Sequence, residues 1–102
     1  MKILLVCNAG MSTGIMQLKL EEHASANNMV ATVEALPISE IENNLEGVDV
    51  ILLGPQVRFA EKDIKKMVDD EIPVFSIDIQ DFGLMRADRV WGQINKELDA
   101  RK

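Results

Sequence analysis

Apolar residues gather in four short runs along the chain, at residues 3–6, 30–36, 48–53 and 73–77. All four runs are rich in β-branched residues and Leu, so each predicts a β-strand. The first, third and fourth runs are almost continuously apolar, which is typical of strands covered on both faces of a parallel sheet.

The segments that separate and follow these runs have a helical pattern, because their apolar residues recur three and four positions apart and form one stripe per helix. The stripes are Met16, Leu20 and Ala24; Ala60, Ile64, Met67 and Val68; and Ala87, Val90, Trp91, Ile94 and Leu98. The connection between the second and third strands is shorter. It predicts a short helix with Ser39 as N-cap and Gly47 as its stop. Ile41 and Leu45 point inward in this prediction.

Alternating strands and helices favour an α/β fold, in which right-handed crossovers place helices on both faces of an open parallel sheet. We expect one domain over residues 1–102, with a four-stranded sheet in the flavodoxin-like order 2-1-3-4. That order puts a topological switch point at the carboxyl ends of the first and third strands, where ligands bind in such sheets. The chain has no internal repeat or linker.

Charge and composition exclude several classes of function. Eleven Lys and Arg against seventeen Asp and Glu leave a net charge of -6, which disfavours binding to nucleic acid and to anionic lipid. The longest apolar runs are too short to span a bilayer or to form a secretory signal, so we expect a cytoplasmic protein. A single cysteine cannot form an internal disulfide or a metal site with several thiolates. Nothing in the chain predicts a metal or a cofactor.

The one cysteine, Cys7, lies in the stretch "CNAGMSTG" between the first strand and the first helix. Gly10 and Gly14 allow backbone angles that turn successive N–H groups inward as an anion-binding nest. The following helix adds its positive N-terminal end, and Ser12 and Thr13 add hydroxyl donors, one of which is expected to cap the helix. These groups favour the thiolate, so the stretch predicts an oxyanion site with a nucleophilic sulfur. The alternative is a small buried residue at the end of a strand.

Known phosphate loops fit this stretch poorly. It lacks the Walker A ending and the dinucleotide fingerprint, and a flavodoxin-like flavin site needs aromatic walls that three Phe, one Trp and no Tyr hardly supply. Low-molecular-weight tyrosine phosphatases and arsenate reductases remain an alternative, but the phosphatases have an Arg six residues after the Cys. Thr13 occupies that position here. Without that cation hydrolysis should be slow, which favours a thiolate that accepts phosphoryl and hands it onward.

Three segments, "KILLVCNAGMSTG", "VDVILLGPQVRF" and "PVFSIDIQDFGLMRAD", resemble the lactose/cellobiose-type enzyme IIB of the bacterial phosphoenolpyruvate-dependent sugar phosphotransferase system. The resemblance covers essentially the whole chain. It implies a phosphocysteine at Cys7, a phosphohistidine on enzyme IIA as donor, and a sugar bound by the membrane permease enzyme IIC as acceptor. It also implies a phosphate loop made of Asn8, Ala9, Gly10, Met11, Ser12, Thr13 and Gly14.

Four further residues are weaker candidates. His23 lies about nine residues into the first helix, roughly 13 Å from Gly14 along its axis, so we interpret it as a surface residue. Arg58 follows the third strand and is either a cation near the loop or a solvated residue. Asp78 and Asp81 follow the fourth strand; they are acid or base candidates, but caps of the last helical region are the favoured interpretation.

Three more side chains have simpler interpretations. Gln56, in the "LGPQ" turn, offers an amide beside the loop and at most a contact for a partner. Met11 is a docking candidate on the loop. Trp91 lies on the apolar stripe of the last helix, and its simplest place is the core.

Overall fold

The computed structural model describes residues 1–8 and 11–101, and for residues 11 and 12 the backbone alone. Four strands form one sheet: β1 (Lys2–Val6), β2 (Thr32–Leu36), β3 (Val50–Leu53) and β4 (Val74–Ser76). All pairings are parallel and the order is β2-β1-β3-β4, which confirms the predicted topology. Val6 is opposite Leu36 in β2 and Leu53 in β3, so these three strands end at one edge of the sheet.

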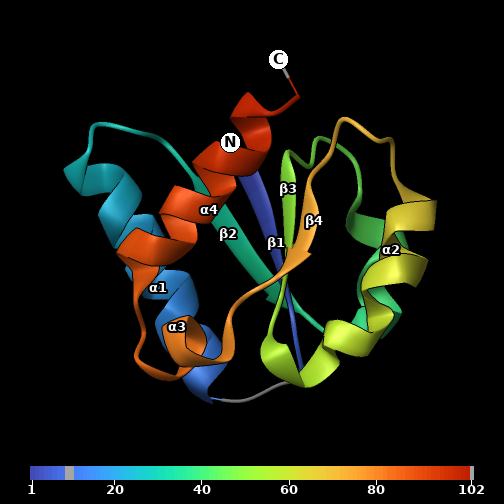
Figure 1. Ribbon diagram of the computed structural model, residues 1–102, viewed down its shortest axis with the longest axis horizontal. Helices are drawn as coiled ribbons and strands as arrows, with labels where there is room; N and C mark the ends of the chain where they lie inside the picture. The colour runs from blue at the N-terminus through green and yellow to red at the C-terminus, as the bar shows by residue number, and fades with distance from the viewer. Residues whose placement is uncertain (9–10, 102) are drawn as a thin grey trace.

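Helices cover both faces of this sheet, as the alternating pattern predicts (Figure 1). The α-helices are α1 (Met11–Ala26), α2 (Glu61–Met67), α3 (Ile79–Gly83) and α4 (Ala87–Asp99), and the 3-10 helices are η1 (Ile38–Glu40), η2 (Glu42–Asn44) and η3 (Pro55–Ala60). Helices α1, α3 and α4 lie on one face, and η3 and α2 on the other. Within the described residues, no helix is both long and apolar enough to cross a membrane.

Two layers of apolar side chains hold the helices to the sheet, because successive residues of a strand point to opposite faces. Ile3 and Leu5 of β1 belong to the layer beneath α1 and α4, whereas Leu4 and Val6 belong to the layer beneath α2. Both central strands are therefore buried on both sides, which explains their continuous apolar sequence. Trp91 is in the first layer, as predicted, and its Nε1–H donates a hydrogen bond to the Leu20 carbonyl at 2.9 Å.

The prediction of one short helix between β2 and β3 is wrong. The chain forms the two 3-10 turns η1 and η2 instead, and Ser39 lies inside η1, which has no side-chain cap. A 3-10 helix rises about 2.0 Å per residue rather than 1.5 Å, so short pieces of it span the crossover with fewer residues. Ile41 is buried and Leu45 partly buried, as predicted. Gly47 has φ +74° and ends the segment.

Three predicted boundaries also differ. β2 begins at Thr32, because its partner β1 begins at Lys2 opposite that residue, and Val30 is exposed. The buried stripe of α2 ends at Ile64, since the chain leaves the helix after the exposed Met67. α1 begins at Met11 rather than near residue 15, so residues 12–14 belong to the helix and not to the loop.

Candidate functional site

Cys7 lies at the centre of the carboxyl edge of the sheet, directly after β1. Its N–H donates to the Leu36 carbonyl of β2 at 3.1 Å, and on the other side the Gly54 N–H donates to the Val6 carbonyl at 2.8 Å. After β1 the chain continues into α1 on one face of the sheet, and after β3 it continues into η3 on the other face. Both connections lie at the lower edge of Figure 1. Cys7 is therefore held at the topological switch point, where sites of open parallel sheets form.

The Cys7 side chain contacts the first turn of α1. Its thiol donates a hydrogen bond to Thr13 Oγ1 at 2.9 Å. A hydroxyl is both donor and acceptor, so Thr13 can turn its O–H toward a thiolate when the thiol has lost its proton. The positive end of the α1 dipole adds to this effect. The contact therefore places beside the sulfur a group that can either accept or donate a hydrogen bond.

The predicted loop residues fall into three groups. Asn8 is exposed, and Gly14 is exposed within α1. Thr13 is 3% exposed and bonded to the sulfur, within the first turn rather than as a cap before it. Ala9 and Gly10, and the side chains of Met11 and Ser12, lie outside the described residues.

The sulfur is not open to solvent, contrary to the expectation of a thiol presented to a visiting protein. Cys7 is 2% exposed. A thiol at a strand end is small and apolar enough to be buried without cost, and here α1 and the β3 side both pack around it. Any reaction at Cys7 therefore requires that the groups over the sulfur move aside.

Gly54, which follows β3, is a site residue that the sequence interpretation did not single out. A Cβ placed on it would be 3.3 Å from Cys7 Cβ and 2.7 Å from Gln56 Oε1. Glycine thus allows the β3 side of the site to approach Cys7 closely. The only signal in the sequence was a glycine directly at the end of a buried strand, a position that often marks close backbone approach.

Arg58 is not brought to Cys7. It is exposed on η3 and lines, with Pro55, Ser76 and Asp78, a hollow of about 500 Å³ at the end of β4. Cys7 does not line that hollow, because β3 lies between β1 and β4. Of the two interpretations of Arg58, the structure favours a solvated residue at the start of a helix over a cation near the loop.

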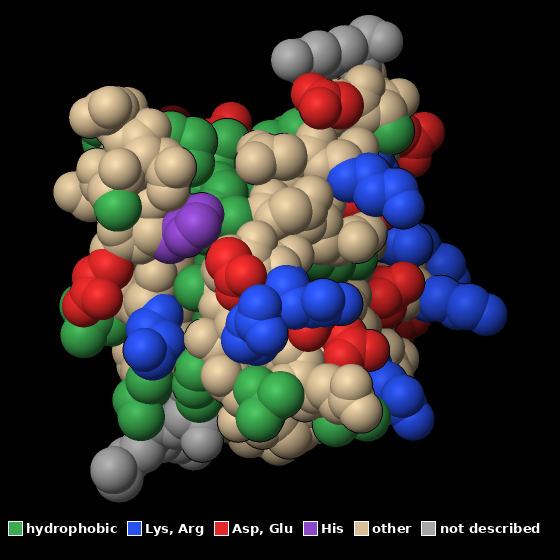
Figure 2. Space-filling view, turned by 60° about the vertical axis from the view of Figure 1, so that its left-hand side comes forward, with side chains coloured by type: hydrophobic (Ala, Val, Ile, Leu, Met, Phe, Trp, Pro, Cys, Tyr) green, Lys and Arg blue, Asp and Glu red, His purple; other side chains and the backbone are tan. Residues whose placement is uncertain are grey.

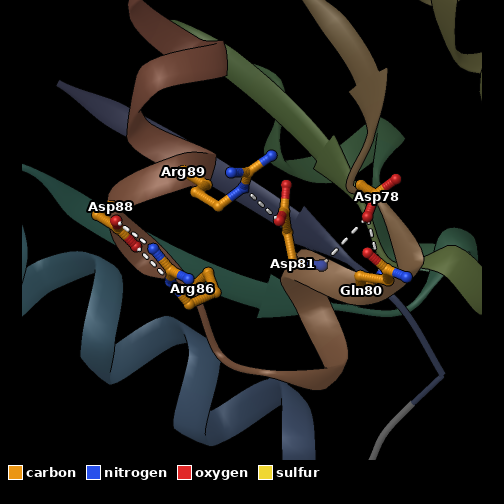
Figure 3. A network of polar contacts seen from close by, with 6 residues as sticks. All are labelled: Asp78, Gln80, Asp81, Arg86, Asp88 and Arg89. Carbon is orange, nitrogen blue, oxygen red and sulfur yellow. Dashed lines mark hydrogen bonds and ion pairs between the residues drawn. The ribbon is translucent and has the colours of Figure 1, made fainter.

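Asp78 and Asp81 are engaged in local structure (Figure 3). Asp78 is the N-cap of α3, and its Oδ1 accepts from the N–H groups of Gln80 at 2.9 Å and Asp81 at 3.2 Å. Asp81 Oδ1 accepts from Arg89 Nε at 2.7 Å, which ties α3 to α4. This geometry favours the capping interpretation over an acid–base role. Asp78 is the cap of α3, and Asp81 lies in the first turn of that helix.

The corner between α3 and α4 carries a second ion pair, shown in Figure 3. Arg86 and Asp88 form a two-pronged contact, with Nε–Oδ1 at 3.1 Å and Nη2–Oδ2 at 2.9 Å. The guanidinium lowers the pKa of Asp88 to about 2, and the carboxylate raises the pKa of Arg86. Met85 in the same corner has φ +54°. These contacts hold the segment after β4 in a defined conformation.

His23 also lies away from the sulfur, as predicted. Its ring stacks on Trp91 with centroids 6.3 Å apart, on the face made by α1 and α4; its imidazole is purple in Figure 2. Among the described residues, no group of three or more His, Cys, Asp or Glu side chains is arranged to hold a metal ion. The site therefore consists of one sulfur, a hydroxyl and the elements around them.

Exposed apolar side chains gather near this edge of the molecule. Figure 2 shows several of them along the lower edge, where the strands end in Figure 1. The exposed large apolar side chains of the elements that follow the strands include Ile15 and Leu18 of α1, Phe59 of η3, Ile79 of α3 and Leu84 after α3. Exposed apolar groups around a site are typical of contacts with another protein.

Comparison with known proteins gives one family. The family described as "PTS system, Lactose/Cellobiose specific IIB subunit" matches residues 2–93. The galactose-specific EIIB component of Lactococcus lactis subsp. cremoris is 37% identical over 94 residues, which are 86% of this chain and 87% of the relative. The oligo-beta-mannoside-specific EIIB component of Bacillus subtilis is 30% identical and covers 90% of each chain.

Solved structures agree. The cellobiose-specific phosphotransferase IIB component of Borrelia burgdorferi is 33% identical, with a TM-score of 0.78 over 100% of this chain and 94% of that one. The lactose-specific IIB domain of Streptococcus pneumoniae shares the fold, with a TM-score of 0.66 at 17% identity over 97% and 91% of the two chains. The chain therefore belongs to the lactose/cellobiose-specific IIB family of the phosphotransferase system, as a phosphotransfer component of that type.

Proposed function

We propose that Cys7 carries a phosphoryl group between a phosphohistidine on enzyme IIA and a sugar bound by the membrane enzyme IIC. In this proposal residues 1–102 act as one IIB domain, cytoplasmic and peripherally associated with the permease. The observation that carries it is the Cys7 thiol at 2.9 Å from the Thr13 hydroxyl, at the start of α1 and at the switch point of the sheet. Family membership supports the same role.

Both transfers occur at one sulfur and need no further reagent. In the first, Cys7 Sγ attacks phosphorus, the P–S bond forms and the P–N bond to the donor imidazole breaks; the thiol proton ends on that imidazole. In the second, a sugar hydroxyl oxygen attacks, the P–O bond forms and the P–S bond breaks, and the hydroxyl proton returns to the sulfur. A thiolate is both nucleophile and leaving group, and Thr13 O–H stabilises it in each step.

The phosphoryl oxygens are held by main-chain N–H groups of residues 8–14, with the hydroxyl of Ser12 as an additional donor. Helix α1 contributes the positive end of its dipole. Among the described residues, no Lys or Arg forms a hydrogen bond with Cys7 or Thr13. A site without a bidentate cation is poorly equipped to hydrolyse the phosphocysteine, which favours the carrier over a phosphatase.

Because Cys7 is 2% exposed, the partner must open the site as it docks. The exposed apolar residues near this edge, Ile15, Phe59, Ile79 and Leu84, provide the contact surface in this proposal. The relatives named for galactose, cellobiose and oligo-beta-mannosides differ in sugar although they share this domain. That difference agrees with a choice of sugar made by the membrane partner.

The experiment is intact-protein mass spectrometry with and without a phosphorylated IIA donor. We expect an adduct of one phosphoryl group that needs the donor and is absent from Cys7→Ser. The purified protein should not turn over aryl phosphate and should not be yellow. Turnover would support the phosphatase alternative, colour would support a flavin module, and an adduct that persists in Cys7→Ser would overturn the role of the sulfur.

A further inference from the structure

On the side of Cys7 that faces β3, the site is bordered by the backbone of Gly54, which has no side chain. The Gly54 N–H donates to the Val6 carbonyl at 2.8 Å, immediately before Cys7 in the chain. The point at which a Gly54 Cβ would stand is 3.3 Å from Cys7 Cβ. The missing Cβ allows this close approach, and the Oε1 atom of Gln56 lies 2.7 Å from the same point.

Gln56 is held in this place by its two neighbours. Pro55 has a fixed φ and begins η3, and Val57 is fully buried, with its N–H donating to the Gly54 carbonyl at 3.0 Å. The backbone of Gln56 is therefore anchored on both sides although the residue itself is exposed. Its carboxamide oxygen lies close to Gly54, the residue that packs against Cys7.

The next polar residue of η3 does not compete for this position. Arg58 lines the hollow at the end of β4 with Asp78 and Ile79, on the other side of β3. The side chain beside Gly54 is thus a neutral amide, whereas the guanidinium of Arg58 lines the hollow at the end of β4. A carboxamide has two N–H donors and no charge, so it can bind an oxygen of a dianion without the strong hold of an Arg pair.

We propose that Gln56 is the phosphoryl-binding residue on the β3 side of the site, where its carboxamide donates a hydrogen bond to an oxygen of the phosphoryl group on Cys7. The bound group is then flanked by α1 with Thr13 on one side and by Gln56 on the other. This inference rests on the proposed phosphocysteine at Cys7. It adds a ligand at a position that residues 8–14, between β1 and the first turn of α1, do not supply.

The test is the single-turnover rate of Cys7 phosphorylation by an excess of phosphorylated IIA donor, in which kcat is the limiting rate constant at saturating donor and KM is the donor concentration that gives half of it. It compares the wild type with Gln56→Ala and Gln56→Glu, and with Arg58→Gln as a matched control on the same 3-10 helix. We expect Gln56→Ala to lower kcat about tenfold with KM for the donor unchanged, the scale of one hydrogen bond to a charged group. Gln56→Glu should lose more, because a carboxylate repels the dianion, and Arg58→Gln should stay within about twofold.

Two results would overturn the proposal: unchanged kcat in both Gln56 variants, or a raised KM with kcat retained, which would make Gln56 a docking residue only. Since Gln56 is exposed, both variants should melt like the wild type. A wild-type protein that never gains phosphate on Cys7 would refute the proposed function instead. The two failures are therefore distinguishable.

Discussion

The Thr13 hydroxyl oxygen lies 2.9 Å from Cys7 Sγ, and both residues are almost fully buried. This contact joins the end of β1 to the first turn of α1. It gives Thr13 a role toward the sulfur itself, in addition to the donor role toward phosphate that the loop pattern suggests. In the proposed transfers, an O–H that can turn toward a thiolate stabilises the attacking and the leaving sulfur alike.

Removing this hydroxyl without changing the shape of the side chain tests that role. We expect Thr13→Val to slow phosphorylation of Cys7 roughly tenfold, the scale of a hydrogen bond to a charged group. Thr13→Ser, which keeps the hydroxyl, should retain most of the rate. The measurement is the initial rate of adduct formation with a phosphorylated donor. Equal rates for the Val and Ser variants would show that the hydroxyl has no part in the transfer.

A methyl group at Gly54 should disturb the site from the β3 side. Gly54→Ala places a Cβ 2.7 Å from Gln56 Oε1 and 3.3 Å from Cys7 Cβ. The Gln56 side chain can swing away, but Cys7 cannot, because backbone hydrogen bonds fix both sides of β1. We expect a loss of about 1–2 kcal/mol of stability and a phosphorylation rate at least as low as that of Gln56→Ala.

Gly92→Ala is the matched control for this substitution. Gly92 is in α4, and a Cβ there has no atom within 4 Å. Since glycine in a helix interior costs roughly 0.5–1 kcal/mol relative to alanine, this variant should be more stable than the wild type and fully active. Urea unfolding measures both variants. A Gly54→Ala protein as stable and active as wild type would refute the close packing at Cys7.

The open edge of β4 should show a pH-dependent contribution to stability. Glu61 Oε1 accepts from the Ser76 N–H at 3.0 Å and from the Ser76 hydroxyl at 2.9 Å, and Oε2 pairs with Lys65 at 3.1 Å. Burial raises the pKa of Glu61, but the hydrogen bonds from Lys65 and Ser76 outweigh it and hold the pKa below its ordinary 4.5. Glu61 thus shields the outward N–H of an edge strand.

A folded-state pKa below the unfolded value stabilises the protein above the unfolded pKa, and the contribution disappears as pH falls through the folded pKa. Glu61→Gln should therefore be less stable than wild type near pH 7, and the difference should shrink below about pH 4.5. Urea unfolding between pH 7 and pH 3 measures it. Glu42→Gln, on the exposed η2, is the control and should show no such trend. A difference that stays constant with pH would contradict the linkage.

The burial of Cys7 has its own consequence. With 2% of the residue exposed, alkylation of the native thiol by iodoacetamide should be at least about a hundredfold slower than in urea, because it requires local opening. Substituting the neighbouring Gly54 by alanine should change this protection, whereas Gly92→Ala should not. Mass spectrometry of timed samples gives the rates. Equal rates in native and unfolded protein would mean that the sulfur is open.

Much of the architecture followed from the sequence because it depends on local patterns. The central strands β1 and β3 must be apolar throughout when both faces are covered, so their runs were recognisable. The alternation of elements and the handedness of crossovers indicated an open parallel sheet, and its predicted strand order was the commonest one for such folds. The irregular connection between β2 and β3 was harder to predict from the sequence. Residues 38–44 form two 3-10 turns because a short crossover must span its length with few residues.

The sequence by itself determined the strands, the parallel sheet and the placement of a lone cysteine at the end of the first strand, since these depend on patterns among neighbouring residues. Only the tertiary structure decided that Thr13 contacts the sulfur, that Gly54 packs against Cys7, that Arg58 lines the hollow at the end of β4 and that the thiol is covered. These contacts depend on strand register and on where α1 begins. A shift of one residue in either would change every one of them while the hydrophobic pattern of the chain stayed the same.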